Sequence, residues 1–103
     1  MKVRKRNGNL QQFNSEKIVV AITSAMKSAS YSDTDNIAEK IALEIEKELI
    51  NNNVKVIEIE DLQDLVEGKL MSSELKDVAR KYIRYRYDRE RVRQSKSKLM
   101  SDI

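Results

Sequence analysis

The chain contains no cysteine and no histidine among its 103 residues. Without cysteine it can form no disulfide, no thiol nucleophile and no cysteine-based zinc or iron–sulfur site. Without histidine it cannot build the usual Ser-His-Asp or Cys-His catalytic groups, and a metal ion would have to be held by carboxylates or by a ligand's phosphates. We therefore predict a protein that performs no catalysis by itself, with no catalytic residues and no metal-binding residues.

Proline is also absent, and glycine occurs only twice. No apolar run approaches the roughly 20 residues that cross a bilayer, and the N-terminus lacks the apolar segment of a signal peptide. These absences predict a soluble protein of the cytoplasm with no membrane partner. The length suits one domain with a modest core. We expect that domain to occupy residues 1–93, because residues 94–103 are polar and have the composition of a tail or a linker.

Charge is unevenly distributed, although the net charge is only +3. One basic cluster lies between Lys2 and Arg6, a second lies between Lys76 and Lys98, and acidic residues dominate between them. Such segregation suits an anionic ligand that is held by both ends of the chain. For the second cluster, a basic face that simply contacts water near a helix C-terminus is an equally good interpretation.

A β-hairpin is predicted over residues 2–13, because Asn7-Gly8 is a strong turn signal and glycine tolerates the positive φ that such a turn requires. We favour a loop with an odd number of residues and with the glycine left-handed, since it lets Val3 and Phe13 pack together on the core. An even loop would put Leu10 beside Val3 instead. With the odd loop, the residues that share the inner face are Val3, Lys5, Gln11 and Phe13.

Two helices should follow the hairpin. Asn14 is a suitable N-cap for the first, and apolar residues then recur at helical spacing up to about Ser30. The second helix should begin near Asp33 or Asp35 and end at the asparagines of residues 51–53.

Two more helices are expected after the segment VKVIEIE, residues 54–60, which is either a short β-strand or a connector. The third should begin near Glu60, and the break at Ser72-Ser73 should cap the fourth. The apolar stripe of the fourth helix consists of Leu75, Val78, Ala79, Tyr82 and Ile83. The predicted fold class is α+β, mainly α, with an N-terminal β-hairpin over a four-helix bundle. A pure four-helix bundle with a disordered basic arm is the alternative, against which the Asn-Gly turn argues.

One group of polar side chains should meet where the hairpin joins the first helix, namely Lys5, Arg6, Gln11, Asn14 and Lys17. A helix N-terminus offers unpaired amide donors and a field that favours anions. A lysine in this first turn is unfavourable for the helix unless an anion lies nearby, so Lys17 indicates a phosphate site. The competing interpretation, which the spacing alone slightly favours, places Lys17 on the solvent face, where an exposed lysine costs little.

Arginines and tyrosines alternate along the fourth predicted helix, with Tyr82, Tyr85 and Tyr87 among them. Aromatic rings that stack on bases, beside cations that hold phosphates, are typical of single-strand nucleic-acid binding. However, Tyr82 falls on the apolar stripe, and Asp88 and Glu90 dilute the positive charge. A small nucleic-acid-binding transcriptional regulator that uses this basic helix is therefore the alternative function, and nucleic acid is the less expected partner.

Four segments in order, VRKRNG, FNSEKI, LQDLVEGKLM and DVARKYIRYRYDRER, resemble the ATP-cone, the nucleotide-binding regulatory domain at the N-terminus of many ribonucleotide reductases. The resemblance covers about residues 2–93 and is greatest to the cone of the anaerobic, glycyl-radical enzyme. It implies a β-hairpin lid over a small helical bundle, with ATP or dATP bound between them. It also implies that the nucleotide controls the activity and subunit association of a catalytic reductase body, and that the domain self-associates in response to nucleotide.

The resemblance further implies a set of nucleotide-binding residues, which are Val3, Lys5, Arg6, Gln11, Asn14, Lys17, Arg86 and Arg89. Lys5 and Arg6 would lie on the base and phosphate side of the ligand. Asn14 and Lys17 would bind the sugar and the phosphates, and the arginines of the fourth helix would reach the phosphates. Mg²⁺ would accompany ATP or dATP, held chiefly by the phosphates and water.

Overall fold

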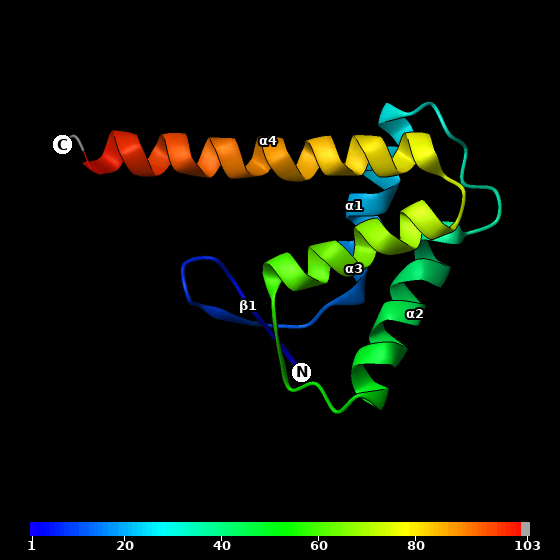
Figure 1. The fold of residues 1–103 in the computed structure, drawn as a ribbon, viewed down its shortest axis with the longest axis horizontal. Helices are drawn as coiled ribbons and strands as arrows, with labels where there is room; N and C mark the ends of the chain where they lie inside the picture. The colour runs from blue at the N-terminus through cyan, green and yellow to red at the C-terminus, as the bar shows by residue number, and fades with distance from the viewer. Residues whose placement is uncertain (102–103) are drawn as a thin grey trace.

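The computed structural model describes the backbone of residues 1–101 and the side chains of residues 1–88. Within this part of the chain, a small sheet that contains the N-terminal hairpin lies beside a bundle of four helices (Figure 1). The helices are α1 (Ser15–Ser28), α2 (Ile37–Asn51), α3 (Ile59–Ser72) and α4 (Lys76–Ser101). The predicted class, α+β and mainly α with an N-terminal hairpin over a helical bundle, is confirmed.

The N-terminal hairpin has the odd loop that its sequence predicts. Strand β1 (Lys2–Arg4) pairs antiparallel with β2 (Leu10–Gln12), in a register that places Val3 opposite Gln11. The loop turns with Gly8 at a φ of 87°, a left-handed conformation that glycine adopts without strain. Val3 is consequently buried in the core, and the polar side chain opposite it faces the same side of the sheet.

A third strand, β3 (Val56–Glu58), lies parallel to β1, so that the strand order is β2-β1-β3. The sequence left this segment undecided between a strand and a connector, because its partner strand lies 54 residues away in the chain. Ile57 is buried beside Val3, and the Arg4 guanidinium pairs with the Glu58 carboxylate at 2.8 Å. The hairpin is thereby held to the start of α3 as well as to α1.

The core forms between the helices and the inner face of the sheet. Its largest fully buried side chains are Ile22, Met26, Ile45, Leu70 and Val78. On α4 the predicted apolar stripe is wrong at Ile83, which is 40% exposed although Tyr82 beside it is buried. Successive side chains of a helix point about 100° apart, so a ring that faces the core turns its neighbour toward the surface.

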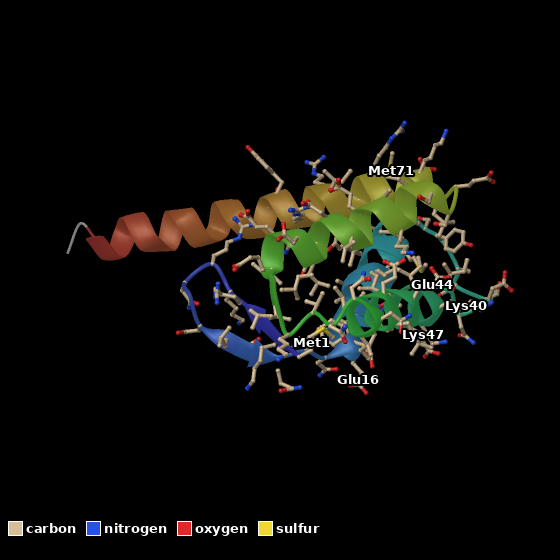
Figure 2. The ribbon with its side chains drawn as sticks, turned by 60° about the horizontal axis from the view of Figure 1, so that its bottom comes forward. Met1, Glu16, Lys40, Glu44, Lys47 and Met71 are labelled. Atoms are coloured by element: carbon tan, nitrogen blue, oxygen red, sulfur yellow. The ribbon has the colours of Figure 1, made fainter. Side chains whose placement is uncertain are left out.

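Ion pairs join α2 to α3 on the outer side of the bundle. The Lys69 Nζ lies 2.6 Å from Glu48 Oε1 and 3.6 Å from Glu44 Oε2. The hydrogen bond to Glu48 raises the pKa of Lys69 above its ordinary value, against the effect of burial. Figure 2 shows Glu44 with Lys40 and Lys47 on the outside of α2. Pairs this exposed contribute at most about 1 kcal/mol to stability.

Side chains cap some of the helix ends, in part as predicted. The Glu16 amide donates a hydrogen bond to Asn14 Oδ1 at 3.0 Å, which confirms Asn14 as the cap of α1. The prediction for Ser72-Ser73 is wrong, because their hydroxyls donate to the Gly68 and Leu70 carbonyls and close α3 instead of beginning α4. A serine hydroxyl both donates and accepts, so the same residue suits either end of a helix.

Asp33 caps α2 from outside the helix. The residue directly before α2, Asn36, is left-handed at a φ of 54° and makes no side-chain cap. Asp33 instead accepts hydrogen bonds from the Ile37 and Ala38 amides at 2.7 and 3.2 Å.

We expect Asp33→Ala to lower the free energy of unfolding by about 1–2 kcal/mol, and Asp35→Ala, at an exposed site, to change it little. Urea denaturation of both variants is the check, and equal losses would contradict this capping role.

Helix α4 is the longest, and it continues to Ser101 across the predicted boundary at Gln94. In Figure 1 its C-terminal half extends beyond the other elements. That residues 94–103 serve as a tail or linker stays a prediction. No helix within residues 1–101 is both long and apolar enough to span a lipid bilayer.

Candidate functional site

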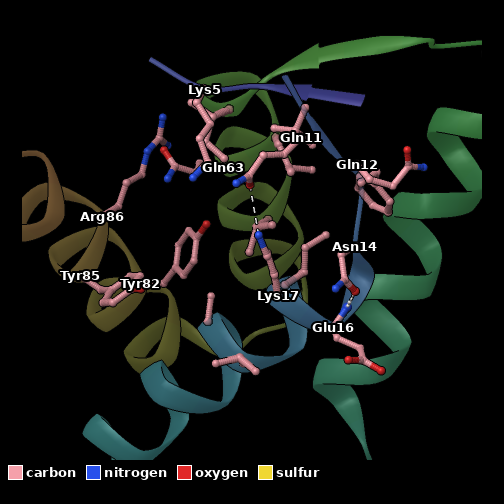
Figure 3. A pocket seen from close by; sticks show the side chains of 18 of the residues that line it. Lys5, Gln11, Gln12, Asn14, Glu16, Lys17, Gln63, Tyr82, Tyr85 and Arg86 are labelled. Atoms are coloured by element: carbon pink, nitrogen blue, oxygen red, sulfur yellow. Dashed lines mark hydrogen bonds between the residues drawn. The ribbon is translucent and has the colours of Figure 1, made fainter. Parts of the chain in front are cut away.

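A cavity of about 550 Å³, here called the main cavity, opens between the hairpin and helices α1, α3 and α4 (Figure 3). Its volume is within the range of roughly 300–1,000 Å³ that is usual for small-molecule sites. The predicted site residues that line it are Val3, Lys5, Arg6, Gln11, Asn14, Lys17 and Arg86. The side chain of Arg89 lies outside the described residues. The structure thus brings the other predicted residues together, and their binding of a nucleotide stays a prediction.

The polar side of the main cavity lies where β2 leads into α1. The Lys17 Nζ donates to Gln11 Oε1 at 3.1 Å, which links the first turn of α1 to the hairpin (Figure 3). Lys17 is exposed, as the competing interpretation held, but it is exposed to the cavity and shares that turn with the Asn14 cap. Because the first turn of a helix already carries a partial positive charge, Lys17 adds to a field that favours an anion.

Both arginines that the structure places in the main cavity are paired with acidic residues of α3. The Arg6 Nη1 lies 2.9 Å from Glu60 Oε1. The Arg86 Nη1 lies 2.7 Å from Asp64 Oδ1 and 3.4 Å from Glu67 Oε1. Burial alone would lower the pKa of Arg86, but the hydrogen bond to Asp64 and the charges of both acids outweigh burial and raise the pKa. Sequence reasoning missed these pairs, because acids near the start of a helix are favourable for the helix by themselves.

Gln63 is a cavity residue that sequence reasoning missed. Its Oε1 is buried and accepts no hydrogen bond from any residue that the structure describes. An unpaired buried acceptor costs roughly 1–3 kcal/mol, so this position suits a ligand that donates a hydrogen bond. Gln63 lies four residues after Ile59 and three before Val66, and both of these line the cavity. A polar residue at helical spacing within an apolar stripe is the signal that could have found it.

The remaining wall of the main cavity is largely apolar. It is formed by Phe13, Ile18, Ile59, Leu62, Val66 and Tyr82, among others. Tyr82 is 4% exposed, which agrees with its predicted place in the core, and Tyr85 lines the same cavity at 42% exposure. A wall of aliphatic and aromatic side chains suits a flat ring, whereas the opposite side suits an anionic group.

Burial raises the pKa of Tyr82 to about 12, although the positive charge of Arg86 opposes the shift. In the unfolded chain this phenol would lose its proton near its ordinary pKa of 10.0, so the folded state should lose stability as the pH rises from 10 toward 12. We expect a loss on the order of 2–3 kcal/mol that is absent from Tyr82→Phe. Tyr87→Phe, at an exposed position, is the matched control, and this variant should lose stability at high pH as the parent does.

Urea denaturation between about pH 9 and pH 12 measures this effect. If the parent and both variants lose the same stability, groups other than Tyr82 cause it.

A second hollow, of about 430 Å³, lies between the end of α1 and the first half of α4. Its lining residues are Ser28, Ala29, Ser30, Asp77, Arg80, Lys81 and Arg84. Arg84 therefore lines this hollow, whereas Arg86 lines the main cavity and is held by α3. Because the described arginines of α4 are divided between two sites, they do not form the single basic surface that the nucleic-acid alternative requires.

Comparison with known proteins identifies one family. The profile of the ATP cone domain matches residues 1–91. The anaerobic ribonucleoside-triphosphate reductases of Haemophilus influenzae and Escherichia coli are 36% and 39% identical to the chain over 101 residues. A vitamin B12-dependent ribonucleoside-diphosphate reductase of Mycobacterium tuberculosis is 35% identical over 101 residues, covering 95% of the chain. Each alignment with the two anaerobic enzymes covers 98% of the chain but only 14% of the relative, so the chain spans a small part of these proteins.

Proposed function

Since the chain belongs to the ATP cone domain family, we propose that it is an allosteric regulatory domain that binds ATP or dATP in the main cavity. ATP cone domains generally bind nucleotide effectors. The observation that carries the proposal is the composition of the cavity, which joins a cationic side at the start of α1 to an apolar wall from α3 and α4. A nucleotide has the same two parts, a charged polyphosphate and a flat base.

The proposed roles of the cavity residues follow from their chemistry. Lys5 and Lys17 would neutralise the phosphates through charge-assisted hydrogen bonds, and Asn14 would orient the sugar. The buried Oε1 of Gln63 would accept a hydrogen bond from an amino or hydroxyl group of the ligand. Mg²⁺ would be held by the phosphates and water, since within the described residues no group of three or more Asp, Glu, His or Cys is arranged to hold a metal ion.

We also propose that the domain regulates a ribonucleotide reductase. The two anaerobic relatives reported above are ribonucleoside-triphosphate reductases. The much larger remainder of such a protein would supply the catalytic body. ATP and dATP would have to favour different states of the domain or of its assembly. A nucleotide that binds two states equally tightly leaves their populations unchanged. Control of subunit association, self-association of the domain and a location in the cytoplasm belong to the same proposal.

Calorimetric titration of the chain with ATP and with dATP in magnesium buffer tests the proposal, with GTP as the control ligand. We expect saturable binding of the adenine nucleotides, and sedimentation run in parallel would report any change of mass on binding. A folded chain that binds no nucleotide, but binds an oligonucleotide with a steep dependence on salt, would instead support the nucleic-acid alternative.

A further inference from the structure

Arg86 joins α4 to α3 at the edge of the main cavity. Its side chain is only 18% exposed, and Nη1 contacts the carboxylates of Asp64 and Glu67. Its Nη2 donates to the Glu60 carbonyl at 3.2 Å. Within the described residues, the hydrogen bonds and ion pairs of this guanidinium all go to α3, although Arg86 also lines the cavity (Figure 3).

The same part of α3 also holds the hairpin. The Glu60 carboxylate pairs with Arg6 at 2.9 Å, while the backbone carbonyl of Glu60 accepts from Arg86. The hairpin, α3 and α4 are thus joined through one short segment of α3. A group that enters the cavity and attracts either arginine acts directly on the contacts between these elements.

The cations of the main cavity differ in how they are paired. Lys5 and Lys17 form no ion pair with a carboxylate in the part of the chain that the structure describes, and Lys17 is bonded to the neutral Gln11. Two lysines, together with Mg²⁺, contact only part of the oxygens of a triphosphate, so the next cation available to the remaining oxygens is an arginine of the cavity. A guanidinium binds phosphate oxygens in the same forked geometry in which it binds carboxylates.

We propose that the polyphosphate of the bound nucleotide competes with Asp64 and Glu67 for Arg86, so that ligand binding loosens α4 from α3. This inference rests on the proposed function, because it assumes that the main cavity binds a nucleotide. Coupling of this kind is reciprocal, so the contacts that hold Arg86 on α3 must lower the affinity for the ligand. Helix α4 extends beyond the other elements (Figure 1), so a change in its attachment to α3 would also act on this extension.

The sign of one mutational effect distinguishes competition from support. If the two acids merely brace Arg86 for the ligand, their neutralisation weakens nucleotide binding. If they compete with the ligand, their neutralisation strengthens nucleotide binding.

The test variant is the full chain with Asp64→Asn and Glu67→Gln combined. We expect its affinity for ATP to rise roughly three- to tenfold and its affinity for AMP to rise less, since AMP has only one phosphate to reach Arg86.

The matched control combines Glu44→Gln with Glu48→Gln. It changes the net charge equally and breaks ion pairs of Lys69, which lie on α2 and α3 away from the main cavity. A gain in the test variant that exceeds the gain in this control supports competition. An equal gain, no gain or a loss in the test variant overturns the inference.

The side-chain amide signal of Arg86 in nitrogen-15 NMR gives a readout that needs no variant. On addition of ATP to the parent chain, the Nε–H signal should shift, and AMP should shift it less. An unchanged signal at saturation overturns the inference.

Different results would refute the two proposals. A parent chain that does not bind ATP refutes the proposed function, whereas ATP binding without the gain in the test variant refutes only the competition for Arg86.

Discussion

Lys17→Ala is expected to weaken ATP binding by roughly 10- to 100-fold, the value of one charge-assisted hydrogen bond in a partly enclosed site. The Lys17 Nζ lies in the first turn of α1, at the cationic side of the main cavity, and is oriented there by Gln11 at 3.1 Å. Its removal leaves the phosphates without the ammonium group of this lysine at the helix N-terminus. Calorimetric titration of the parent and the variant with ATP measures the change.

Lys27→Ala provides the matched control for this variant. Lys27 lies in the last turn of the same helix, is exposed and does not line the main cavity. Its loss changes the net charge equally, so any general effect of charge on nucleotide binding appears in both variants. Lys5→Ala should resemble Lys17→Ala. If both cavity variants bind ATP as tightly as the parent, the nucleotide does not bind where we propose.

Ile45→Ala is expected to lower the free energy of unfolding by about 2–5 kcal/mol, because it removes a side chain that is fully enclosed in the core. A domain of this size has a total stability on the order of 5–15 kcal/mol, so the loss is a large part of it. Leu43→Ala on the same helix is the control. Because Leu43 is 53% exposed, this substitution should lower the free energy of unfolding far less. The midpoints of urea denaturation compare the two, and similar losses would mean that α2 does not pack as described.

The hairpin and the start of α1 could be predicted because their signals are local. An Asn-Gly pair specifies its own turn, and the N-cap Asn14 bonds to an amide only two residues away. The parity of the loop also followed from local patterning, since an odd loop places Val3 and Phe13 on the same inner face. Such features need no knowledge of the remaining chain.

The features that the sequence left undecided or assigned wrongly have two causes, a distant partner for β3 and an ambiguous hydroxyl for the serines. Strand β3 is recognisable only once β1 lies beside it, and a short apolar segment alone does not distinguish a strand from a connector. The serines at the end of α3 were assigned to the wrong helix, because a hydroxyl suits both helix ends.

The candidate site divides in the same way. The residues in the first turn of α1 and on the inner face of the hairpin could be gathered from spacing, because two neighbouring elements position them. Gln63 and the pairing of Arg86 with Asp64 could not, since these arise where α3 and α4 pack together. Sequence reasoning assigned Arg86 to the ligand alone, whereas the structure shows that α3 already holds it.

Nitrogen-15 NMR of the chain during titration with ATP in magnesium buffer tests whether the nucleotide binds in the main cavity. We expect the largest shifts at the start of α1, at the hairpin and on the cavity face of α3, including Asn14, Lys17 and Gln63. Shifts that instead cluster at the second hollow, or no shifts at saturating ATP, would contradict the proposal that the main cavity is the nucleotide site.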